Sequence, residues 1–193
     1  MRSQHGPKQP KEKFKNMNKT NIKQQLRRTF SALVVIGALF TLPKAQADPP
    51  APAHGYSNDC ENLISMQHPG PNTIILLNIT ATFTGTFDGT WAGTERDVIH
   101  ADGSGMVHGS GVFSGSVNVN GSVRSGTMTF SYVVIFPPNG TEVTHWVVDQ
   151  GTGDLAGIHG HGTTPNAEET GPTEDCPWDT FLVEYDGRIQ FGP

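Results

Sequence analysis

Lysine is absent from residues 48–193 of this 193-residue chain, and that part has only three arginines against seventeen aspartates and glutamates. Its formal net charge is therefore −14, although the whole chain carries only −5. Such an acidic surface repels nucleic-acid phosphates and anionic lipid headgroups. The composition therefore excludes nucleic-acid binding, and it excludes membrane binding by the folded part of the chain.

Cysteine is scarce as well, with Cys60 and Cys176 the only two. A disulfide-dense scaffold is excluded, and neither cysteine lies in a catalytic cysteine signature. The two flank the expected core, so in an oxidising compartment they are predicted to pair with each other. A bridge that closes so long a loop stabilises a fold by about 4–5 kcal/mol in the chain-entropy model.

Recognisable catalytic and cofactor motifs are missing too. The sequence has no Ser-His-Asp elbow, paired glycosidase carboxylates, phosphate loop or dinucleotide fingerprint. No cofactor is therefore expected.

The first 47 residues have the organisation of a secretory signal peptide. Ten of the thirteen basic residues lie here, and Arg27 and Arg28 precede an apolar run over residues 30–42 and the Ala45-Gln46-Ala47 cleavage pattern. Thirteen residues rise about 20 Å as a helix, which is too short to span a bilayer. We expect cleavage after Ala47 and export from a bacterial cytoplasm, to the periplasm or the medium.

Two details of export stay open. The pair Arg27-Arg28 followed by Thr29-Phe30 allows twin-arginine export beside general secretion, although the residue upstream of the pair is Leu26. Translation from Met17 would shorten an overlong basic region.

After the leader, the sequence predicts two parts. Residues 48–59 are expected to form a disordered spacer, because the stretch begins Asp-Pro-Pro-Ala-Pro and has little to bury. Residues 60–193 are expected to form a single domain.

Apolar and polar residues alternate along most of this domain, which predicts β-strands with one buried face. Alternating stretches begin at Ile74, Thr90, Val107, Thr127, Thr141 and Leu155, and residues 180–185 and 188–191 are expected to form a final hairpin at Asp186-Gly187. Residues 165–175 are expected to form an exposed acidic loop. Asp102-Gly103 and Asn120-Gly121 mark tight turns between strands. No ten-residue stretch after the leader has a sustained helical period.

Seven or eight short strands joined by hairpin turns predict an all-β fold, a closed antiparallel up-and-down barrel or a sandwich. Glycines inside the strand patterns favour the barrel, because tight coiling gives those positions a reason to lack a side chain. They are Gly109, Gly111, Gly115, Gly126, Gly157, Gly160 and Gly162.

Residues 85–94 and 151–162, above all the Gly-Thr-Gly-Asp-Leu-Ala-Gly segment at 151–157, resemble a bacterial family of small proteins whose domain has no assigned function. The likeness covers roughly residues 73–185. That family is placed with the allene-oxide-cyclase-like barrels, which include the plant dirigent proteins. The resemblance implies an eight-stranded antiparallel barrel with a central apolar cavity. It implies no reaction, since function does not follow from fold.

Two groups of polar residues are candidates for chemistry. His159 and His161 share one strand face, and His145 lies on the preceding strand. These histidines could bind a metal ion, or they could have only a structural role. We favour the structural role and expect no metal. Glu95, Asp97, His100 and Asp102 follow Trp91 and offer acid–base groups, although a solvated strand face is favoured for them.

The aromatic residues on the expected inward faces either fill a core or line a pocket for one small apolar ligand. They are Phe83, Phe87, Phe113, Phe130, Tyr132, Phe181 and Tyr185. The leading hypothesis is binding of a small apolar or amphipathic molecule, with Phe83, Phe113, Phe130, Tyr132, Phe181 and Tyr185 as contacts. The alternatives are a cyclase or isomerase that uses Glu95, Asp97, His145 or Tyr132, and a structural or interaction protein.

Overall fold

A computed structural model describes residues 48–138 and 142–192 of the chain. The predicted signal peptide, residues 1–47, lies outside the described residues. Within the described ranges, no helix is long and apolar enough to cross a membrane.

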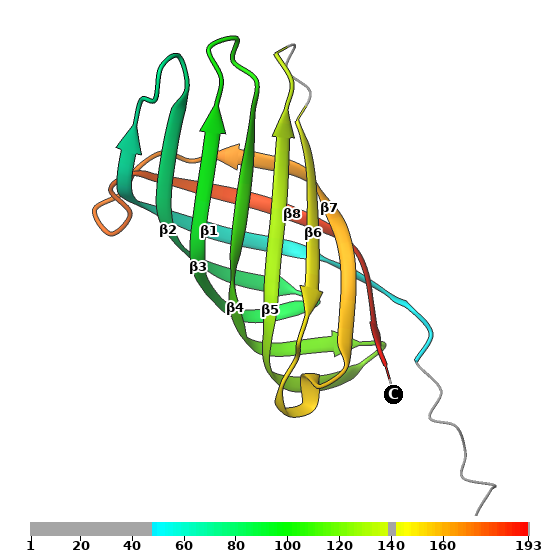
Figure 1. Cartoon of the computed structure of the whole chain (residues 1–193). Helices are drawn as coiled ribbons and strands as arrows, with labels where there is room; N and C mark the ends of the chain where they lie inside the picture. Colours follow the sequence, from blue (N-terminus) through cyan, green and yellow to red (C-terminus); the bar gives the residue numbers. More distant parts are fainter. Residues whose placement is uncertain (1–47, 139–141, 193) are drawn as a thin grey trace, which may run out of the picture. The chain divides into compact units, whose positions relative to one another are not determined.

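Eight antiparallel strands form one sheet in chain order (Figure 1). They are β1 (Ala51–Gln67), β2 (Thr73–Gly85), β3 (Phe87–Ile99), β4 (Gly105–Val119), β5 (Ser122–Phe136), β6 (Val143–Asp149), β7 (Ile158–Glu169) and β8 (Asp179–Phe191). Each strand pairs with the next, and β8 pairs with β1 over eleven residues, so the sheet closes into a barrel. The predicted all-β, antiparallel, eight-stranded fold is confirmed.

The prediction of a disordered spacer at 48–59 is wrong, because β1 begins at Ala51. Ala51 and Ala53 are buried, and the strand pairs with β8 from its first residue. Pro52 is tolerated here because β2 pairs with β1 only from Gly55 onward, so no partner on that side needs its missing N–H. The folded domain therefore begins at the start of this strand and not at residue 60.

The expected hairpin at Asp186-Gly187 is also wrong, because β8 runs through it as one strand. Gly187 is needed for space, not for a turn: a Cβ there would lie 2.4 Å from Cζ2 of Trp146. A turn that the sequence reading missed separates β2 from β3 at Thr86, where Gly85 has a φ of 109°.

The expected acidic loop over 165–175 is shorter than predicted, because β7 continues to Glu169. The ladder between β7 and β8 shifts register between Thr163 and Asn166, and Pro165 lies inside this irregularity. Proline is tolerated at a bulge because the ladder there lacks a bond that would need its N–H.

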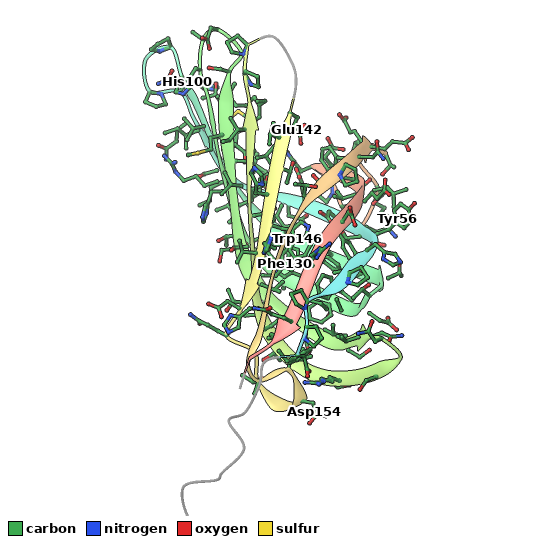
Figure 2. All side chains as sticks on the ribbon, turned by 90° about the vertical axis from the view of Figure 1, so that its right-hand side faces the viewer. Tyr56, His100, Phe130, Glu142, Trp146 and Asp154 are labelled. Carbon is green, nitrogen blue, oxygen red and sulfur yellow. A yellow bond between two sulfur atoms is a disulfide. The ribbon has the colours of Figure 1, made fainter. Side chains whose placement is uncertain are left out.

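The two ends of the barrel carry different connections. The β1–β2, β3–β4, β5–β6 and β7–β8 connections lie at one end, which we call the open end; the β1–β2 and β3–β4 connections are at the top of Figure 1. The chain turns at Thr86, at 120–121 and at 150–157 lie at the other, which we call the closed end. Figure 2 shows His100 at the open end and Asp154 at the opposite extremity.

Residues 150–157 plug the closed end. A short 3-10 turn at Gly153–Leu155 inserts Leu155, which is fully buried, and the Thr152 N–H donates to the Thr127 carbonyl over 2.7 Å. A Cβ at Gly151 would lie 1.8 Å from the Leu155 carbonyl oxygen, so the plug requires glycine there. The Gly-Thr-Gly-Asp-Leu-Ala-Gly segment therefore has a structural role in the fold.

Tightly packed aromatic and aliphatic side chains fill the barrel interior next to the plug, toward the closed end. Phe87 is fully buried at the centre, and its ring lies 5.1 to 6.2 Å from those of Phe83, Phe113, Phe130, Trp146 and Tyr185. Ile158, Ile189, Val148 and Val117 complete this core. Rings at these separations pack edge to face or tilted, which is favourable.

The open end is held by the predicted disulfide between Cys60 of β1 and Cys176 of the β7–β8 connection. Their Cα atoms are 5.4 Å apart, and 116 residues separate them in the sequence. The bridge ties the last connection of the barrel to the first strand.

Candidate functional site

A pocket of about 470 Å³ occupies the barrel interior toward the open end. We call it the acidic pocket, after its carboxyl groups Asp59, Glu61, Glu95, Asp97, Glu142 and Glu169. Glu142 and Glu169 are exposed, so the pocket reaches solvent beside the β5–β6 and β7–β8 connections. Apolar side chains around this mouth are Val107, Val134, Phe136, Ala167, Phe181 and Val183.

Aromatic rings form the deep part of the acidic pocket: Phe83, Trp91, Phe130, Tyr132, Trp146 and Tyr185. Phe130 and Trp146 stack with their centroids 5.7 Å apart, and Figure 2 shows both below Glu142. These rings separate the pocket from the packed core at the closed end.

Hydrogen bonds to the backbone fix three of these rings. Trp91 Nε1 donates to the Phe130 carbonyl over 3.1 Å, and Trp146 Nε1 donates to the Thr163 carbonyl over 3.1 Å. The Tyr185 hydroxyl accepts from the Phe87 N–H at 2.9 Å and donates to the Thr84 carbonyl at 3.1 Å. A buried tyrosine or tryptophan needs such partners, so the rings form a preorganised surface.

Glu95 and Tyr132 meet in the pocket across an intervening glycine. Glu95 of β3 pairs with Gly109 of β4, which in turn pairs with Tyr132 of β5. The Tyr132 ring lies over Gly109, where a Cβ would come within 2.2 Å of Cζ, and the Tyr132 hydroxyl donates to Glu95 Oε2. The glycine therefore allows the phenol to reach the carboxyl group.

Burial keeps the pocket's carboxyl groups protonated to unusually high pH. Removal from water, with a smaller contribution from acidic neighbours, raises the pKa of Glu61 and of Glu95 from 4.5 to about 8. The bond from Tyr132 acts in the opposite direction on Glu95. Burial also raises the pKa of Asp59 to about 6, raises that of Asp97, and raises that of Tyr132 well above 10.

Two carboxyl oxygens in the pocket lack hydrogen-bond partners. They are Oδ1 of Asp97, whose residue is only 9% exposed, and Oδ1 of Asp59. Of the described residues that line the pocket, none is lysine, arginine or histidine. Buried acceptors without a donor cost about 1–3 kcal/mol each, and active and binding sites are places where such groups persist.

The structure brings together three of the four sequence-predicted catalytic candidates. Glu95, Asp97 and Tyr132 line the pocket, whereas His145 is exposed on the outer face of β6. The interpretation of Glu95 and Asp97 as a solvated strand face is wrong, because both side chains are buried with Trp91. His100 and Asp102 lie outside, at the β3–β4 turn.

Five of the six predicted ligand contacts line the acidic pocket: Phe83, Phe130, Tyr132, Phe181 and Tyr185. Phe113 does not; it is fully buried in the packed core on the closed-end side. The alternation pattern assigned Phe113 to the correct face, but it could not place the residue along the barrel axis.

The sequence reading missed the pocket residues Asp59, Glu61, Trp91, Trp146, Glu142 and Glu169. The signal for Asp59 and Glu61 was their spacing of two in the segment Ser57-x-Asp59-x-Glu61. The prolines just before this segment and the cysteine inside it favour a spacer that ends at a domain boundary, and they obscure its alternation. Trp146 was detectable from Thr144-x-Trp146-x-Val148, which alternates on β6.

The three histidines that could have formed a metal site do not converge on the pocket. His145, His159 and His161 are exposed, and His159 Nδ1 lies 3.0 Å from Asp149 Oδ1 on the outer surface. Within residues 48–138 and 142–192, no three His, Cys, Asp or Glu side chains are grouped as metal ligands.

These features define a class of protein: an eight-stranded antiparallel β-barrel with a pocket open at one end. The family model described as "Protein of unknown function (DUF3224)" matches residues 64–174, more than half of the chain, and the chain therefore belongs to the DUF3224 family. The predicted relation to a family whose domain has no assigned function is confirmed.

Among solved structures, the chain is similar to a DUF3224-family protein of unknown function from Shewanella oneidensis MR-1. The TM-score is 0.56 at 17% identity, and the match covers 75% of this chain and 99% of that one. This likeness shows a shared fold. None of the curated proteins matches the chain.

Proposed function

We propose that this protein is exported from a bacterial cytoplasm and binds a small amphipathic molecule in its acidic pocket. The observation that carries the proposal is a cavity of about 470 Å³ with a floor of fixed aromatic rings and carboxyl groups on its walls. Ligand pockets usually measure about 300–1,000 Å³ and combine apolar walls with a few converging polar groups.

Export is supported by the basic and apolar pattern of residues 1–47 and by the disulfide, which is typical of an oxidising compartment. Intact-mass analysis of the exported protein should give a chain that begins at Asp48 and is two hydrogens lighter than its fully reduced form. A retained leader or two free thiols would contradict this part of the proposal.

Binding can be tested with a neutral solvatochromic dye and a pair of variants on β5. Val134 lines the pocket, and its neighbour Val133 faces outward. Val134→Trp should fill the pocket and abolish native-state dye binding, whereas Val133→Trp should leave it intact. Equal binding by both variants, or none by the unmodified protein, would contradict the proposal and favour a structural role.

A cyclase or isomerase is the second candidate, and the bond between Tyr132 and Glu95 inside the pocket is the observation that favours it. A carboxyl group with a pKa near 8 can take up or give up a proton at neutral pH. Deuterium exchange into the α-carbon of apolar ketones tests this activity. Exchange should disappear in Glu95→Gln; its absence from the unmodified protein would reject the candidate.

The allene-oxide-cyclase-like relationship belongs to this proposal as well. Eight antiparallel strands that close on themselves around a pocket support it.

A further inference from the structure

The acidic pocket is unusual because it is lined by many carboxyl groups and, among the described residues, by no basic side chain. All six carboxyl groups face a space to which no cationic side chain of the described residues contributes. The arginines of the domain lie elsewhere: Arg96 and Arg188 are exposed on the outer surface, and Arg124 pairs with Asp48 at the closed end. Where these carboxyl groups are ionised, no cationic side chain of the described residues compensates their charge.

Asp97 gives an independent indication of what the pocket receives. Its side chain is nine-tenths buried, lines the pocket, and leaves Oδ1 without a hydrogen-bond partner. The adjacent Glu95 already accepts from Tyr132, so its carboxyl group is partly satisfied by the protein. An orphaned buried acceptor is satisfied by a ligand that donates a hydrogen bond, and a charged donor does so most strongly.

Aromatic rings flank these carboxyl groups. The Trp91 and Tyr132 ring centroids are 6.0 Å apart, and both side chains line the pocket with Asp97. A cation beside such rings gains attraction from their π faces, and an apolar body behind it packs on Phe130 and Trp146. Glu142 and Glu169 at the mouth would attract a cation from solution.

We propose that the acidic pocket selects a protonated amine with an apolar body, whose N–H group donates to Asp97 while the body lies on the aromatic floor. This inference rests on the proposed binding function and names its ligand class. A bare metal ion fits less well, because the described carboxyl groups are not gathered as a ligand set. A quaternary ammonium lacks the N–H that Asp97 requires.

The test compares by calorimetry three probes that share a 4-phenylbutyl body: 4-phenylbutylamine, 4-phenylbutanol and 4-phenylbutyltrimethylammonium. The titrations are made at about pH 9, which lies above the pKa of about 8 of Glu61 and Glu95 and below the pKa near 10 of the amine, so the carboxyl groups are mostly ionised and the amine is mostly protonated. The amine should bind at least about tenfold more tightly than the alcohol or the quaternary ion, as expected for a charge-assisted hydrogen bond.

Two variants on β3 assign the effect to the pocket. Asp97→Asn should lower amine affinity about tenfold and leave alcohol binding unchanged, because it removes one charge and keeps the shape. Asp88→Asn is the matched control, since Asp88 is an exposed carboxylate on the same strand and does not line the acidic pocket. It should change neither affinity. A thermal melt of each variant confirms that it is folded.

The outcomes separate the two levels of the proposal. If the neutral dye and all three probes fail to bind, the proposed binding function itself is wrong. If the alcohol binds as tightly as the amine, the pocket binds ligands without selecting an amine, and only this inference is overturned. Retained amine preference in folded Asp97→Asn would also overturn it, because the preference would then arise elsewhere.

Discussion

The two ends of this barrel are built from the same eight strands but are stabilised in different ways. At the closed end, Leu155, Phe87 and Phe113 are fully buried, and a plug of residues 150–157 covers them. At the open end, a disulfide joins Cys60 to Cys176, and the interior holds a cavity with buried carboxyl groups. The comparison indicates that stability is concentrated at one end while the other keeps polar groups available for binding.

An aromatic residue of the packed core, Phe87, and one that borders the pocket, Phe130, should distinguish the two ends most clearly. Phe87→Ala should lower the free energy of unfolding by about 4 kcal/mol, because the ring is surrounded by five others. Phe130→Ala should cost only about 2 kcal/mol, since Phe130 already borders the cavity and has fewer contacts to lose. Urea unfolding of both variants measures the difference, and equal losses would contradict a division into packed and hollow ends.

The disulfide should matter next, and mainly at the open end. The double variant Cys60→Ser/Cys176→Ser should lose about 3 kcal/mol of unfolding free energy. This is less than the chain-entropy value for a loop of 116 residues, because a compact unfolded chain has less entropy to lose when the bridge forms. Amide hydrogen exchange should accelerate at Cys60 and its neighbours in β1 and in the β7–β8 connection, with little change around Leu155. Uniform acceleration over the whole barrel would show that the two ends unfold together.

The buried carboxyl groups predict a stability that falls as pH rises. Glu61 and Glu95 have pKa values of about 8 when folded and ordinary values near 4.5 when unfolded, so the folded state binds more protons between these limits. The unliganded protein should therefore lose stability from pH 4.5 to 8, by about 2 kcal/mol, because solvent at the mouth reduces the full effect.

Urea unfolding at a series of pH values checks this slope. The double variant Glu61→Gln/Glu95→Gln should flatten it, whereas Glu168→Gln, at an exposed position of β7 beside the pocket residue Glu169, should not. A stability that rises with pH over this window would mean that both carboxyl groups are ionised in the folded protein.

The smallest effect is expected at the surface of the closed end. Arg124 Nη2 lies 3.0 Å from Asp48 Oδ2, and both side chains are partly exposed. Asp48→Asn should cost about 0.5 kcal/mol in urea unfolding, as is typical for an exposed ion pair. A loss above about 2 kcal/mol would show that this ion pair stabilises the closed end far more than a typical exposed ion pair does.

The sequence by itself determined the all-β class, most strand positions, the inward faces and the cysteine pair. Alternation such as Met128, Phe130, Tyr132 on β5 fixes which side chains share a face, because successive residues of a strand point to opposite sides. The local sequence pattern predicts the wrong structure where a short segment is compatible with both a turn and a strand. Asp186-Gly187 has the composition of a turn, yet the neighbouring Trp146 ring requires its glycine inside a strand.

Only the tertiary structure decided how far along the barrel each inward residue lies, and therefore which belong to the pocket. Phe113 and Tyr132 both alternate correctly, but Phe113 is packed toward the closed end and Tyr132 reaches Glu95 over Gly109. That contact depends on the register of three strands, which is set by pairing between distant segments. Burial of Glu95 and Asp97 has the same origin: period two places both on one face, and only closure of the sheet turned that face away from water.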